Sequence, residues 1–218
     1  MQRTLPSGYA TGVVVDAQAH RALVSGPTGL RVLDTRDGHL LATVAVPLLF
    51  HAPLVVPGGR ALAASFGWGA WHRGTLRLLD TRRGRVVWAT LLAGAPLALA
   101  TDARRGRVYV ETCVYGPTQP WCAFGLTVIA LADGHVRRTI ALSSHVMVTA
   151  MAVDARTGHL FIASQGGPLL PVDDPWAGIR NLLPFALPFL PRVVQPTPGA
   201  GSAGAMQQGR VTVLDIDH

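Results

Sequence analysis

The sequence contains no lysine, so all 19 of its basic residues are arginine, and its formal net charge is +7. A nucleic-acid reader usually gathers its basic residues on one element. Here most arginines are expected in turns between apolar runs, for example Arg36, Arg82, Arg83, Arg104, Arg105 and Arg156. Nucleic-acid binding is therefore not favoured, although turns that share one face of a fold could still form a basic rim.

Motifs of common catalytic sites are also missing. The sequence has no Gly-x-Ser-x-Gly elbow, no phosphate-binding loop and no His-Glu-x-x-His pair. The only glutamate, Glu111, has no second acid near it in the sequence. His51 and His145 precede expected innermost strands and could face a channel, but the other histidines considered fall in turns, at His20, His39, His135 and His159. We predict no catalytic residue, no metal site and no cofactor.

No apolar run reaches the ~18 to 20 residues that a transmembrane helix needs. The first residues, 1–6, also lack the charged region and apolar core of a signal peptide. The composition, 49% hydrophobic and 14% charged over 218 residues, nevertheless predicts a folded globular body. The 24 glycines and 16 prolines are spread among short β-branched runs. This distribution predicts an all-β protein of many strands and turns.

An internal repeat is the strongest feature of the sequence. Residues 29–40, 75–86 and 125–136 share one template, in which a strand is followed by a turn glycine and a second strand. The turn glycines Gly38, Gly84 and Gly134 are 46 and then 50 residues apart. A fourth copy begins at Arg210 and reaches only His218. A period of this length is typical of propellers and other repeat folds.

A second hairpin precedes each copy, within residues 13–25, 54–63, 98–110 and 150–164. Two hairpins per repeat make one four-stranded antiparallel blade, and stacked blades bury the apolar faces that a lone blade would expose. Aspartates that end strands are interpreted as turn residues, whose carboxylates accept backbone N–H hydrogen bonds. We predict a single propeller domain over residues 1–218, with blades at about 9–46, 51–92, 95–142 and 146–218.

The repeat resembles a known family. In the template of the repeat, a strand, an Asp-Ala-x-x-Gly turn and a second strand precede the motif Leu-Asp-Thr-x-x-Gly. This pattern is similar to the YVTN repeats of YncE-like and quinoprotein-dehydrogenase-like propellers. Residues 108–111 and 160–163 approximate the YVTN signature itself. The resemblance implies an all-β propeller of about four four-stranded blades, fewer than the roughly seven of complete rings in this family. A partial propeller is therefore expected.

The two ends of the sequence also indicate a partial propeller. Residues 1–5 resemble the outer strands expected at 42–44 and 138–140. Either this outer-strand remnant pairs with residues 211–216 and closes a ring, or both ends are cuts within a larger propeller. If the ring is incomplete, the chain could also be half of a homo-oligomeric ring.

Two insertions interrupt the template. The first lies between Cys113 and Cys122, the only cysteines, which flank a loop that a disulfide could clamp. Closing so short a loop would contribute about 3 kcal/mol, and two buried thiols are the alternative. The second insertion, residues 165–209, includes a segment at 172–183 that could begin a helix. It could act as a lid or touch a membrane, although packing on the propeller's own flank is favoured.

Function in a propeller is expected on its loops. The binding candidates are the loop tryptophans Trp68, Trp71, Trp121 and Trp176. The family resemblance implies a non-enzymatic binding or scaffold protein with a protein, peptide or small ligand. The rival interpretation is a quinoprotein-dehydrogenase-like or lactonase-like enzyme. The resemblance and the predicted disulfide together imply an extracytoplasmic location, which the missing signal peptide does not support.

Overall fold

A computed structural model describes residues 10–46, 52–66, 73–115, 122–142, 146–166 and 209–215. Every regular element in these ranges is a β-strand, and all pairings between strands are antiparallel. The predicted all-β class is thus confirmed. Within the same ranges, no helix has the length and apolar character needed to cross a membrane.

The strands form four sheets, which we call blades 1 to 4. Blade 1 contains β1 (Gly12–Asp16), β2 (Arg21–Gly26), β3 (Gly29–Asp34) and β4 (Leu40–Val44). Blade 2 contains β5 (Leu54–Val56), β6 (Arg60–Phe66), β7 (Gly74–Asp80) and β8 (Arg85–Leu91). Blade 3 contains β9 (Ala95–Asp102), β10 (Arg107–Tyr115), β11 (Cys122–Ala130) and β12 (Val136–Ala141). Blade 4 contains three described strands, β13 (Val146–Asp154), β14 (His159–Gly166) and β15 (Gly209–Asp215).

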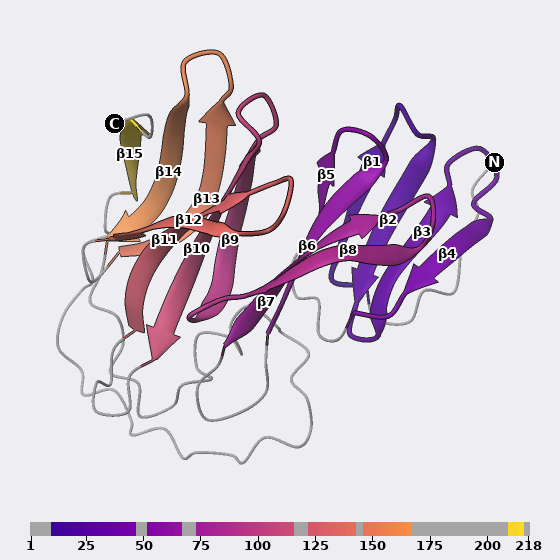
Figure 1. The fold of residues 1–218 in the computed structure, drawn as a ribbon, viewed down its shortest axis with the longest axis horizontal. Coiled ribbons are helices and arrows are strands. Elements are labelled where there is room, and N and C mark those ends of the chain that lie inside the picture. Colours follow the sequence, from indigo (N-terminus) through magenta and orange to yellow (C-terminus); the bar gives the residue numbers. More distant parts are fainter. Residues whose placement is uncertain are drawn as a thin grey trace, which may run out of the picture.

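The blades stand side by side in an open arc (Figure 1). Within each blade the strands follow one another in sequence order. The first strands of successive blades contact each other, β1 with β5, β5 with β9 and β9 with β13, so they form the inner side of the arc. Blade 1 and blade 4 lie at opposite ends, as Figure 1 shows, and blades 2 and 3 separate them.

Three apolar cores lie between neighbouring blades. Strand residues point alternately to the two faces of a sheet, so one strand feeds two cores. In β7, for example, Leu78 packs toward blade 3 whereas Leu79 packs toward blade 1. The near-continuous apolar runs in the sequence are explained by this arrangement, because the inner blades are covered on both faces.

The aspartates at strand ends hold the following turns. A carboxylate oxygen of Asp34 accepts a hydrogen bond from the backbone N–H of Arg36 at 2.8 Å, and Asp154 accepts one from Arg156 at 2.8 Å. Asp80 and Asp102 make the same kind of bond at 3.0 Å. The backbone N–H of Arg156 accordingly holds the pKa of Asp154 below its usual value. The sequence-based interpretation of these aspartates as turn residues is confirmed.

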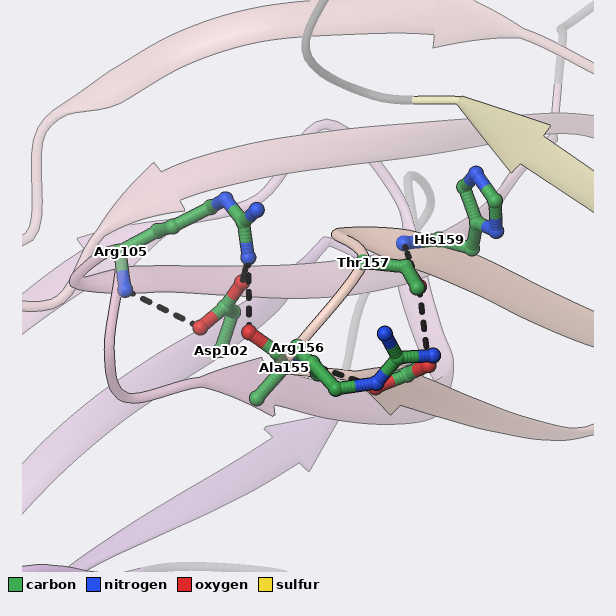
Figure 2. A network of polar contacts seen from close by, with 7 residues as sticks. Asp102, Arg105, Ala155, Arg156, Thr157 and His159 are labelled. Atoms are coloured by element: carbon green, nitrogen blue, oxygen red, sulfur yellow. Dashed lines mark hydrogen bonds and ion pairs between the residues drawn. The ribbon is translucent and has the colours of Figure 1, made fainter.

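Polar contacts also link the turns of neighbouring blades. The guanidinium of Arg105 donates to Asp102 at 2.9 Å within blade 3 and to the carbonyl of Ala155 in blade 4 at 3.0 Å. Figure 2 shows both bonds, which meet at the same guanidinium nitrogen. Between blades 2 and 3, the indole N–H of Trp88 donates to the carbonyl of Leu131 at 3.0 Å. Each of these two hydrogen bonds joins one blade to the next.

Replacing Gly134 with alanine is expected to lower the free energy of unfolding more than the same change at Gly106. Both glycines have left-handed backbone angles, φ 76° and 64°, which cost an alanine about 1 to 2 kcal/mol. At Gly134 a Cβ would also lie 2.8 Å from the ring of Trp88, whereas nothing lies within 4 Å at Gly106. Overpacking should add about 1 to 3 kcal/mol. Urea unfolding of both variants measures the difference, and equal losses would contradict the packing of Trp88 on this turn.

Candidate functional site

The only glutamate of the chain is buried between blades 3 and 4. Glu111 lies on β10 opposite Leu126 of β11, and its side chain is fully shielded from solvent. The register of the other blades places Ser25, Ala64 and Ala163 at the equivalent position. Three blades thus carry a small residue where blade 3 carries a carboxyl group.

The carboxyl group of Glu111 has no hydrogen-bond partner for either oxygen among the residues that the structure describes. Burial raises its pKa to about 7. The backbone N–H of Val148, on β13 of blade 4, faces the group and lowers the pKa by a smaller amount, although it falls short of hydrogen-bond geometry. Burying a carboxylate without partners is costly, so the proton is held more tightly than in water.

Both inner strands at this point are irregular. The pairing of β9 with β10 shifts register between Glu111 and Thr112, and the pairing of β13 with β14 shifts between Val148 and Ala150. A bulge bends a strand and changes the direction of a side chain, and bulges are frequent beside active sites. Both shifts lie where Glu111 of blade 3 faces Val148 of blade 4.

Apolar side chains surround the site. Leu126 and Val148 belong to the core between blades 3 and 4, and Cys113 packs with Phe124 farther along the same face of β10. A buried carboxyl group with a pKa of about 7 can change its protonation state at neutral pH, but a general acid or base must also reach its substrate, and Glu111 does not line the hollow of blade 3. The sequence signal for this site was available, namely the single glutamate of the chain at a position that the repeat fills with small residues.

The sequence-predicted candidates have different outcomes. Trp68, Trp71, Trp121 and Trp176 lie outside the described residues, as do His51 and His145. The turn histidines His20, His39 and His135 are exposed, and His159 is half-buried. Across the described ranges, no group of three or more histidine, cysteine or acidic side chains could hold a metal ion.

The two cysteines lie on the hairpin formed by β10 and β11. Cys113 lies opposite Phe124, and Tyr115 lies opposite Cys122, so the cysteines are diagonal neighbours in the ladder. Cys113 is buried and is not a free thiol. The side chain of Cys122 lies outside the described residues. Their pairing in a disulfide therefore stays a prediction.

The connections that contain the loop candidates follow the second strand of three blades. The second strands β6, β10 and β14 run in the same direction because each blade repeats the same antiparallel order. The connections that follow them, at 67–73, 116–121 and 167–208, contain the four candidate tryptophans. These connections all begin at the ends of β6, β10 and β14, so they attach to the same rim.

The opposite rim carries the short turns and most of the arginines. Aspartates accompany them there, as in the ion pairs of Arg105 with Asp102 at 2.9 Å and of Arg137 with Asp133 at 3.2 Å. The described part of this rim is thus a mixture of both charges, which disfavours a phosphate-binding face.

A hollow of about 550 Å³ lies on the outer half of blade 3, on its face toward blade 4. Its lining includes Val128, Ala130 and Ile140, together with Arg105, Arg107, Arg137 and Arg138. The outer strand β8 of blade 2 contacts the turn between β11 and β12 of blade 3, through Trp88 and Gly134. In blade 4 the equivalent turn would follow β15, outside the described residues.

Comparisons with known proteins identify the fold. No protein-family model and no curated protein matches the sequence. Among solved structures, the hydrazine synthase of Kuenenia stuttgartiensis is similar with a TM-score of 0.61 and 14% identity, over 76% of this chain and 47% of that chain. The dihydro-heme d1 dehydrogenase NirN, in complex with DHE, is similar with a TM-score of 0.53 and 18% identity, over 75% and 33%.

A third similar structure is the β-propeller domain of Cps50 (Swd1) from Myceliophteria thermophila, with a TM-score of 0.50 and 12% identity, over 72% of this chain and 47% of that chain. The predicted propeller fold is confirmed by this similarity and by the arrangement of the sheets. The chain spans less than half the length of each of these three chains.

Proposed function

We propose that the chain is a non-enzymatic binding or scaffold module of the YncE-like, YVTN-repeat type, with its ligand site on the loop rim. The observation that carries the proposal is the common attachment of three connections to that rim, after β6, β10 and β14. These connections contain Trp68, Trp71, Trp121 and Trp176. Tryptophan supplies a large contact area and a polar N–H, and it is enriched at binding sites.

The ligand class follows from the same chemistry. Aromatic side chains on several neighbouring loops suit an extended peptide or a flat apolar molecule, because each ring covers one segment of it. A disulfide between Cys113 and Cys122 would restrain the connection that carries Trp121 and lower the entropy lost on binding. On the opposite rim, described arginines pair with aspartates, as Arg105 does with Asp102 and Arg137 with Asp133.

A peptide library tests this proposal without knowledge of the natural ligand. Phage-displayed random peptides selected on the immobilised chain should bind a variant with Trp68, Trp71, Trp121 and Trp176 changed to alanine at least about tenfold more weakly, a loss of about 1.4 kcal/mol. Trp88→Phe is the control, because Trp88 lies between blades 2 and 3. Peptides that bind the loop variant as tightly as the native chain would overturn the proposal.

A second candidate function is an enzyme of the quinoprotein-dehydrogenase-like or lactonase-like kind. Glu111 favours it, because a buried carboxyl group with a pKa of about 7 suits proton transfer. Two of the similar propellers are enzymes by name, a synthase and a dehydrogenase. Hydrolysis of a lactone probe that Glu111→Gln abolishes, with peptide binding unchanged, would favour this candidate over the binding module.

A further inference from the structure

Both ends of the arc leave an apolar sheet face uncovered. On blade 1 the face turned away from blade 2 exposes Val13 and Val15, which are 63% and 57% exposed. On blade 4 the face turned away from blade 3 exposes Phe161, Val211 and Val213. Apolar residues that adjoin on one open sheet face can form a surface for association.

The repeat indicates what belongs on the open face of blade 4. The pair of Phe161 with Val213 occupies the register position of Tyr109 with Val128 in blade 3. Blade 1 and blade 2 have Leu23 with Val32 and Leu62 with Leu78 at this position. All six of those side chains are buried against the following blade, whereas Val213 is 51% exposed. The face of blade 4 is therefore built to receive another blade.

The open face of blade 1 shows the complementary pattern. Val15 lies opposite Ala22, as Val55 lies opposite Ala61 in blade 2 and Val153 opposite Leu160 in blade 4. Val55 and Val153 pack against the preceding blade. A preceding blade is what would cover Val15. The chain's own blade 4 has the required face, but it lies at the other end of the arc (Figure 1).

We propose that two copies of the chain join head to tail, blade 4 of each on blade 1 of the other, and close one ring of eight blades. The occupant of each open face is a second copy because each contact would continue the blade-to-blade packing already present three times in the chain. A head-to-tail contact made twice closes a ring when each copy turns through half a circle. Eight blades lie at the upper end of the usual range of about four to eight.

The contact is apolar, but each copy carries a formal net charge of +7. Added salt screens the repulsion between like-charged copies and strengthens apolar contacts. Association should therefore increase with ionic strength.

Light scattering after size exclusion tests the assembly. At concentrations on the order of 10 μM, the chain should elute with twice its mass of 23.0 kDa, and dilution should release monomers. Val15→Lys alone and Val213→Asp alone should each give monomers. An equimolar mixture of the two variants should recover the dimer, because one contact is then native and the other joins lysine with aspartate.

The outcomes separate this assembly from its alternatives. A monomer at every concentration and salt level would overturn the proposal, and so would a series of larger open assemblies. A dimer broken by Val213→Asp but not by Val15→Lys would indicate a blade 4 to blade 4 contact and would also overturn it. Circular dichroism of both variants checks folding, which the exposed positions should preserve. Peptide binding at the loop rim is a separate measurement and does not enter these outcomes.

Discussion

The native protein is expected to lose about 3 kcal/mol of stability between pH 4.5 and pH 7, and Glu111→Gln is expected to remove this loss. The pKa of Glu111 is raised from 4.5 to about 7 because the folded chain buries the group. The folded state therefore binds more protons than the unfolded state in this interval. Stability is fully present below the unfolded pKa and falls as pH rises through the folded pKa.

Urea unfolding at half-unit pH steps measures this dependence for both proteins. Glutamine keeps the shape of the side chain and does not titrate, so the difference between the two curves isolates Glu111. Asp133→Asn is the matched control. The backbone N–H of His135 holds the pKa of the exposed Asp133 below its usual value, so this carboxylate stays ionised between pH 4.5 and pH 7. Parallel curves for the native chain and Glu111→Gln would mean that the carboxyl group is hydrated in the folded state.

Leu126→Ala is expected to lower the free energy of unfolding by about 2 to 5 kcal/mol. Leu126 is completely buried in the core between blades 3 and 4, and it lies opposite Glu111 in the sheet. Its truncation removes transfer energy and leaves a cavity that strands held from both sides cannot close. Denaturation monitored by circular dichroism gives the loss.

Val136→Ala is the control for this truncation. Val136 lies on the outer strand β12 and is 49% exposed, so its truncation should change stability by no more than about 0.5 kcal/mol. If both variants lost the same free energy, the contact between blades 3 and 4 would not be a packed core. The truncation also bears on Glu111, since a cavity beside the carboxyl group would admit water and move its pKa toward 4.5.

The pH dependence and the Leu126→Ala truncation both concern the interface between blades 3 and 4. Blades 3 and 4 meet at Glu111 and Val148, where both inner strands are bulged, and at the hydrogen bond from Arg105 to Ala155. An ionised Glu111 destabilises the first of these contacts and leaves the second intact. At neutral to alkaline pH, the contact of Glu111 with Val148 should therefore weaken before the hydrogen bond from Arg105 to Ala155 does.

The sequence by itself determined the elements that depend on neighbouring residues. The period of the turn glycines gave the blades, and the aspartates at strand ends gave the turns that Asp34 and Asp154 hold. Near-continuous apolar runs predicted strands covered on two faces. All these features are local, because a strand and its turn are set by a few consecutive residues.

The tertiary structure decided what the repeat leaves open. Glu111 has no second acid near it in the sequence, and its pKa is raised because the folded chain buries it. Val128 and Val213 occupy the same position in the template, yet one is 7% and the other 51% exposed. The physical reason is the same in both cases: burial of a strand residue is determined by the blade packed against it, and that blade comes from a different part of the chain.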